Sequence, residues 1–142
     1  MNKVIPVLFI FSVLLAGCSK EDEVDSLKGL VSFASNPAYD NGNISFVAQI
    51  QFSSSGQAVD IEYQLMDGDI VLQSETLSTE NADGGLGLFF ETAEIIVSLN
   101  PISDFSGKDL TVWLDPENKV TASEYTDETN VNLWKKETVS IP

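Results

Sequence analysis

The side chains able to do chemistry are few in this chain, and the missing types restrict it most. The sequence has no His, all seven of its basic residues are Lys, and it has a single Cys. Imidazole metal sites, Ser-His-Asp or Cys-His catalysis and bidentate Arg clamps on phosphate are therefore excluded. No Gly-rich nucleotide loop or nucleophile-elbow pattern occurs either. We expect a protein that is not an enzyme and that uses no organic cofactor.

Cys18 follows a hydrophobic segment that begins after a short positive start at Lys3. The apolar run from Val4 to Ala16 is shorter than the about 20 residues of a membrane-spanning helix, so it predicts a cleaved signal peptide over residues 1–17. The motif Leu15-Ala16-Gly17-Cys18 resembles the bacterial lipobox. This resemblance implies cleavage before Cys18 and acylation of its thiol, with lipid chains such as palmitate holding the protein on a membrane. The alternative is an ordinary free or buried thiol.

An acidic stretch joins Cys18 to the rest of the chain over residues 18–28. Its first residues, Ser19, Lys20, Glu21 and Asp22, resemble the export signal that places lipoproteins of Bacteroidota on the outer face of the outer membrane. The stretch also fits a solvated tether, because it combines many charges with few apolar side chains. We expect a lipid-anchored outer-membrane protein that faces the cell exterior, with the periplasm-facing leaflet as the alternative.

The charge balance limits the partners of the protein. The formal net charge is −15, with 22 acidic residues against seven basic ones. Such a surface repels nucleic acid and anionic lipid head groups, so neither is an expected partner beyond the anchoring membrane itself.

A cluster of oxygen-bearing side chains between the last two predicted strands is a candidate calcium site, because Ca²⁺ prefers carboxylate and amide ligands. It comprises Asp115, Glu117, Asn118, Glu124, Asp127 and Glu128. Asp67 with Asp69, and Asn81 with Asp83, are weaker versions. Asp and Asn also shape turns by accepting hydrogen bonds from their own backbone, which is the alternative. Glycoside hydrolysis by paired carboxylates is not expected, since a small sandwich offers no evident cleft.

The elements that must position these side chains are β-strands, because apolar residues alternate from Gly29 onward instead of recurring every three or four positions. The predicted strands span residues 30–34, 44–52, 59–65, 70–77, 86–90, 94–99, 110–115 and 131–141. The segments 86–90 and 94–99 form either one strand with a bulge or two strands. Asp67-Gly68 predicts a tight hairpin. Seven or eight such strands predict one immunoglobulin-like two-sheet β-sandwich over residues 29–142, an all-β fold.

The two tryptophans alternate with the core residues of the last two predicted strands. Trp113 falls between Val112 and Leu114, and Trp134 follows Leu133. These strands are neighbours in an immunoglobulin-like sheet, so both indoles would lie on one outer face. Such a face would be a platform for sugar rings or for an apolar protein surface. The alternative is that a bulge or a loop covers at least one ring.

The segment from Leu110 to Asn130 resembles the end of a CARDB domain, the cell-adhesion-related domain found in bacteria. There a hydrophobic strand runs into Asp-Pro-x-Asn, then a Val, a Glu and a Glu-x-Asn-Asn run. The matching residues are Asp115, Pro116, Asn118, Val120, Glu124, Glu128 and Asn130. The stretch from Ser45 to Leu77 resembles that family's opening of strand, turn, strand and hairpin. The resemblance implies an immunoglobulin-like sandwich that serves cell-envelope proteins as an adhesion or spacer module.

These observations predict a surface lipoprotein whose sandwich is a non-catalytic binding or adhesion module for extracellular glycan or protein. The alternative is a structural accessory subunit of a cell-envelope complex that docks on another bacterial protein.

Overall fold

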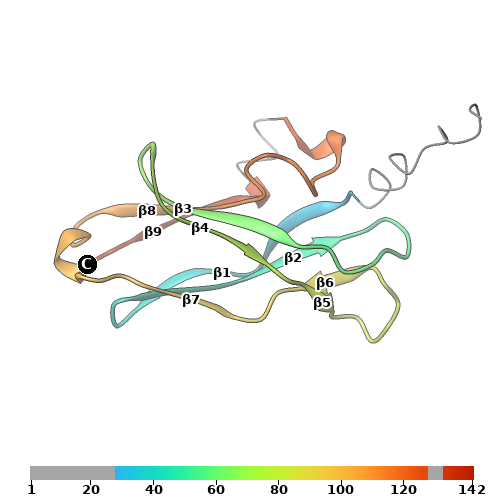
Figure 1. Cartoon of the computed structure of the whole chain (residues 1–142), viewed down its shortest axis with the longest axis horizontal. Helices are drawn as coiled ribbons and strands as arrows, with labels where there is room; N and C mark the ends of the chain where they lie inside the picture. The colour runs from blue at the N-terminus through green and yellow to red at the C-terminus, as the bar shows by residue number, and fades with distance from the viewer. Residues whose placement is uncertain (1–27, 128–132) are drawn as a thin grey trace, which may run out of the picture.

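The computed structural model describes residues 28–127 and 133–142 as an all-β sandwich of two antiparallel sheets (Figure 1). One sheet has the order β1-β2-β6-β5, with β7 also paired to β2, and the other has the order β4-β3-β8-β9. The strands are β1 (Leu30–Asp40), β2 (Asn43–Gln51), β3 (Ile61–Asp67), β4 (Ile70–Leu77), β5 (Glu80–Asn81), β6 (Phe89–Glu91), β7 (Ile95–Ser98), β8 (Asp109–Leu114) and β9 (Lys136–Ser140).

This strand order is that of an immunoglobulin-like sandwich. With β6 and β7 taken as one interrupted strand, the sheets correspond to the orders A-B-E-D and C′-C-F-G of that fold. The predicted fold class is therefore confirmed, with nine strands in the described residues in place of seven or eight. Two short 3₁₀ helices, η2 (Ile102–Asp104) and η3 (Ser123–Tyr125), lie in the connections. No helix in these residues is long and apolar enough to cross a membrane.

The strands form where the sequence alternates, because alternate side chains of a strand point to opposite faces. In β2, the buried residues Ile44, Phe46, Ala48 and Ile50 are separated by half-buried ones. The two sheets meet where the ring of Phe46 packs edge-to-face on that of Tyr63 from β3, with their centroids 5.2 Å apart. Packing of these apolar faces holds the sheets together.

Two hairpins close one end of the sandwich, opposite the end where β1 begins (Figure 1). Asn41 and Gly42 join β1 to β2 with positive φ angles of 47° and 87°, as a type I′ turn requires. Gly68 and Asp69 join β3 to β4, and Gly68 has a φ of 59° at the first central position, which is typical of a type II′ turn. The hairpin predicted from Asp67-Gly68 is thus confirmed.

The segments 86–90 and 94–99 belong to one line of pairing that is interrupted. Both β6 and β7 pair with β2, at its opposite ends. Between them, the backbone N–H of Thr92 donates to the carbonyl of Ala48 at 2.9 Å, and the N–H of Ala48 donates to Thr92 Oγ1 at 3.1 Å. The Thr92 hydroxyl therefore replaces a backbone acceptor at the interruption.

The last predicted strand is shorter than expected. It begins at Lys136 instead of residue 131, and Leu133, predicted to face the core, is 62% exposed. The reason lies in the neighbouring strand, because the N–H of Leu114 donates to the carbonyl of Lys135 and Asp115 then turns away with a φ of 43°. Leu133 and Trp134, the described residues directly before Lys135, are helical instead of extended. Other boundaries differ as well: β1 extends to Asp40, β3 spans Ile61–Asp67 and β6 begins at Phe89 instead of residue 86. The short strand β5 is absent from the predicted strands.

Candidate functional site

A groove of about 390 Å³ lies on the outer face of the four-stranded sheet, the face turned away from the core. It extends from the centre of β8 to the β3–β4 hairpin and is lined by Met66, Gly68, Asp69, Thr111, Trp113, Lys136 and Thr138. Core residues Val112 and Leu114 flank Trp113 in sequence and point the other way. The alternation predicted for Trp113 therefore places its ring at this groove.

Trp113 and Lys136 form the centre of the groove. They are directly paired in the β8–β9 register, and Lys136 Nζ lies 4.0 Å from the centroid of the indole ring. This is a cation–π contact, in which the ammonium rests on the electron-rich ring face. The indole Nε1 is buried and donates no hydrogen bond within the described residues. Trp113 is thus a half-buried ring with a lysine over it, and not a bare platform.

Hydroxyl groups continue the groove beyond the aromatic ring. Thr111 Oγ1 and Thr138 Oγ1 lie 3.3 Å apart across β8 and β9. The carboxylate of Asp69 and the thioether of Met66 complete the lining at the hairpin end. An aromatic ring beside hydroxyl, carboxylate and ammonium groups offers both apolar contact and hydrogen bonds, which is the combination that a sugar ring requires.

The second predicted ring is elsewhere. Trp134 precedes β9 and packs edge-to-face on Tyr125 of η3, with ring centroids 5.7 Å apart. It is half-buried and is not among the residues that line the groove. The structure therefore does not bring the two tryptophans together on one face, because β9 begins only at Lys136, after Trp134.

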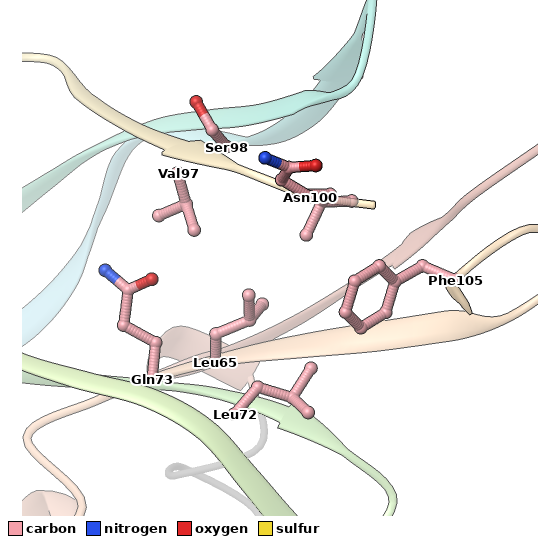
Figure 2. Close-up of a pocket in the computed structure, with 8 residues that line it drawn as sticks. Leu65, Leu72, Gln73, Val97, Ser98, Asn100 and Phe105 are labelled. Atoms are coloured by element: carbon pink, nitrogen blue, oxygen red, sulfur yellow. The ribbon is translucent and has the colours of Figure 1, made fainter. Parts of the chain in front are cut away.

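A smaller pocket of about 170 Å³ opens between the two sheets (Figure 2). The side chains of Leu65, Leu72, Val97 and Phe105 point into it from opposite sheets and from the loop after η2. Gln73, Ser98, Leu99 and Asn100 complete its lining.

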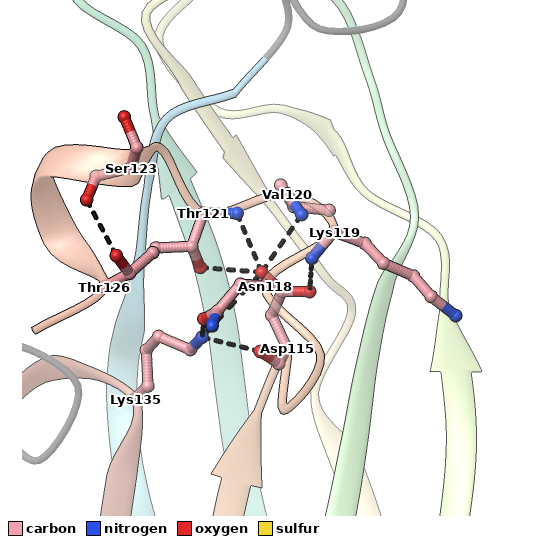
Figure 3. Close-up of polar contacts among 8 residues, drawn as sticks. All are labelled: Asp115, Asn118, Lys119, Val120, Thr121, Ser123, Thr126 and Lys135. Carbon is pink, nitrogen blue, oxygen red and sulfur yellow. Dashed lines mark hydrogen bonds and ion pairs between the residues drawn. The ribbon is translucent and has the colours of Figure 1, made fainter. Parts of the chain in front are cut away.

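The carboxylate of Asp115 organises the loop after β8 (Figure 3). Its Oδ1 accepts a hydrogen bond from the N–H of Lys119 at 2.9 Å. Its Oδ2 accepts bonds from the N–H of Val120 at 3.0 Å and from the N–H and the hydroxyl of Thr121 at 2.7 and 2.6 Å. These four hydrogen bonds to one carboxylate fix the turn that follows β8.

Lys135 lies under this loop, and its side chain is only 1% exposed. Its Nζ donates to the carbonyl oxygen of Asp115 and to Oδ1 of Asn118, both at 2.5 Å, and lies 3.9 Å from the Asp115 carboxylate. Burial lowers the pKa of Lys135, while the negative charge of Asp115 opposes this shift. The contact set is that of a structural ion pair, because every acceptor belongs to the loop that the lysine supports.

The residues proposed for calcium are thus largely engaged in turn chemistry. Asp115 and Asn118 bind the loop and Lys135, and Glu117 pairs with Lys119 at 2.9 Å. Glu124 and Asp127 also have interactions of their own, and Glu128 lies outside the described residues. Within the described ranges, no three acidic side chains gather as a metal site would require.

The weaker acidic pairs are likewise engaged. Asp67 pairs with Lys108 at 2.7 Å. The carboxylate of Asp83 accepts hydrogen bonds from the N–H groups of Gly87, Leu88 and Phe89 at 3.0, 2.6 and 2.9 Å. Desolvation raises the pKa of Asp83, but these backbone donors outweigh it and lower the pKa to about 2.

Sequence reasoning missed two buried polar residues that shape this architecture. Lys135 carries no motif, and a Lys beside a second Lys suggests a solvated surface. Thr92 replaces a ladder bond, and its signal was the parity shift between residues 90 and 95. A lysine within reach of the Asp-Pro-x-Asn turn would have been a clue only with the turn's geometry in hand.

The predicted anchor lies outside the described residues. This holds for Cys18 and for the export-signal residues Ser19, Lys20, Glu21 and Asp22. Comparison of the chain with protein-family models, with curated proteins and with solved structures finds no match. The resemblance to CARDB domains stays a prediction.

Proposed function

We propose that this chain is an outer-membrane lipoprotein whose sandwich is a non-catalytic binding module for an extracellular ligand. The anchor is supported by the single cysteine at the end of a short hydrophobic segment. The ligand class that the groove fits best is glycan. The contact of Trp113 with Lys136 in a groove rimmed by threonine hydroxyls is the observation that carries this proposal.

The position of the groove on the molecule supports an outward-facing role. The chain enters the sandwich at Gly29, which bonds to Val120 and Ala122 at the end opposite the hairpins. The groove reaches Gly68 and Asp69 of the β3–β4 hairpin. A lipid anchor on Cys18 would attach at the Gly29 end, so the groove would open toward the end more distant from the membrane.

A binding experiment tests the groove. We expect Trp113→Ala in the full chain to weaken any glycan binding by about 1–3 kcal/mol, the usual loss when an aromatic anchor is truncated. Trp134→Ala is the matched control, because that ring lies outside the groove. Glycan-array screening followed by calorimetry would measure both variants, with urea unfolding to verify that each is folded. Binding unchanged in Trp113→Ala and lost in Trp134→Ala would reject the groove as the site.

A labelling experiment tests the anchor. We expect radiolabelled palmitate to enter the protein in a bacterial host that processes lipoproteins, and Cys18→Ser to abolish the label and release the protein from the membrane. Protease treatment of intact cells then separates the exterior from the periplasm-facing leaflet. An unlabelled protein that is cleaved normally without Cys18 would contradict the proposed localisation.

A further inference from the structure

Two strand edges face each other across the small pocket between the sheets. Among the described strands, β4 is the last in its sheet, and β7 pairs with β2 alone. The pocket between them is lined by five apolar side chains and by the polar Gln73, Ser98 and Asn100 (Figure 2). Its 170 Å³ is enough for one aliphatic side chain. The free backbone groups of an edge strand are a template for an added strand.

Exposed apolar side chains gather along these edges. Seven large hydrophobic residues are exposed in the described part of the chain, and five of them lie on β4, β7 or η2. These five are Ile70, Val71, Leu72, Ile96 and Ile102. Ile70, Val71 and Leu72 are consecutive on β4, so the edge of this strand is a better candidate for docking than the isolated Leu86 or Leu133.

The edge of β4 is open at one half and protected at the other. Glu75 is paired in register with the core residue Tyr63 and therefore sits on the inner face of the sheet, and inward charges discourage the addition of a strand. Between Gln73 and Val71 the register shifts, so Leu72 has no partner on β3 and reaches the pocket. The half from Ile70 to Leu72 has no charged side chain.

The charges around the open half define the partner. Asp69 directly precedes Ile70, and Asp104 follows Ile102 by two residues. The ion pair of Lys108 with Asp67 joins the loop after η2 to the β3–β4 hairpin, so both carboxylates lie at the same end of the molecule. Lys108 is neutralised there by Asp67. An apolar pocket with an acidic rim suits an apolar segment flanked by basic residues.

We propose that the edge from Ile70 to Leu72 and the adjoining pocket bind an extended segment of a partner protein, with Lys or Arg at its flanks and an aliphatic side chain in the pocket. The segment adds as a strand beside β4, a known mode of peptide recognition. This site shares Asp69 with the rim of the Trp113 groove, but its pocket has a different lining and the proposal does not rest on glycan binding. A second copy of this chain is disfavoured, because two strongly acidic domains repel each other.

A peptide titration tests the site. The probe is the labelled peptide KTVTLTVTK, with ETVTLTVTE and KTVTATVTK as partners that change only the flanking charge or the central side chain. Fluorescence anisotropy with the full chain in mild detergent would measure binding. Hydrogen–deuterium exchange with and without the peptide would show which backbone amides become protected.

We expect the basic, leucine-centred peptide to bind at least about tenfold more tightly than either alternative peptide, because one alternative reverses the flanking charges and the other leaves the apolar pocket unfilled. We expect Leu72→Lys to abolish binding and Leu86→Lys, at an exposed leucine outside the pocket, to leave it unchanged. Amides from Ile70 to Leu72 should gain protection. Equal binding of all three peptides, equal loss in both variants, protection elsewhere, or self-association without peptide binding would each overturn the proposal.

Discussion

Lys135 Nζ lies 2.5 Å from the carbonyl oxygen of Asp115 and 3.9 Å from its carboxylate. The buried ammonium of Lys135 thus binds the start of the loop after β8. The carboxylate of Asp115 binds the other end of this loop, at Thr121. Thr121 in turn forms a bridge with Gly29, where the chain enters β1. The buried pair therefore joins the entry of the sandwich to the end of β8.

Replacing Lys135 by Met should lower the free energy of unfolding by about 3 kcal/mol, because it leaves the buried Asp115 charge without its cation. Asp115 keeps its four hydrogen bonds, so we expect a cost at the low end of the usual range for breaking a buried ion pair. Urea unfolding followed by circular dichroism would measure it. Lys108→Met is the matched control, since its ion pair is exposed and should cost less than about 1 kcal/mol. Equal small losses would show that the buried pair is not structural.

Replacing Thr92 by Val should cost about 1–3 kcal/mol, the penalty of leaving a buried backbone donor without an acceptor. The change keeps the side-chain shape and removes only the hydroxyl that accepts the N–H of Ala48. Thr138→Val on the exposed outer face gives the comparison, and we expect it to be close to neutral. Hydrogen exchange at Ala48 offers a second readout, because this amide should lose protection in Thr92→Val alone. Full protection of the Ala48 amide in Thr92→Val would show that the Thr92 hydroxyl is not its hydrogen-bond acceptor.

Stability should fall in alkaline solution because of Tyr63. Burial, with the charge and hydrogen bond of Glu75, raises the pKa of Tyr63 to about 12, although the hydrogen bond from Gln73 opposes the shift. An unfolded tyrosine ionises near pH 10, so between about pH 10 and 12 the unfolded state binds fewer protons and is favoured. Tyr63→Phe should lack this component. Parallel unfolding curves for both proteins across that range would contradict the assigned pKa.

In acid, Asp83 should make the protein less stable as the pH falls. Its pKa of about 2 lies below the value near 4 of an unfolded aspartate, so its stabilising effect is present above pH 4 and is lost as the pH falls through about 2. The urea midpoint of Asp83→Asn should therefore lie below that of the original protein at pH 5, with the gap closing toward pH 2. A gap that stays constant with pH would exclude the carboxylate charge as its cause.

The fold could be predicted from the sequence because β2 and β3 are amphipathic. Ile44, Phe46, Ala48 and Ile50 alternate with mostly polar neighbours, which predicts the buried face of β2. The Asp-Gly pair predicts the turn from β3 to β4. The shift of parity between residues 90 and 95 indicated an interruption there, but it left one strand or two open, and their common pairing with β2 comes from the structure. Local pattern therefore determined most of the elements and the two-sheet architecture.

The candidate site could be predicted less well from the sequence, because it depends on contacts between residues far apart in the chain. The parity of Trp113 predicted its place on the outer face. The contact of its ring with the Lys136 ammonium could not be predicted, because it depends on the register between β8 and β9. Trp134 was predicted to lie on the last strand, but β9 begins only at Lys136, and the turn at Asp115 sets this start. Lys135 was not singled out in the sequence, because the partners that it binds in the interior come from a loop 17 to 20 positions earlier.

The most direct test of the proposed function uses the fluorescence of Trp113 in the Trp134→Phe variant, where it is the remaining tryptophan. Titration with the best ligand from a glycan array should change the emission of Trp113 in a saturable way, with the same dissociation constant as calorimetry. The change is expected because a ligand in the groove must displace or cover the Lys136 ammonium. Calorimetric binding with no change in Trp113 emission would contradict the account.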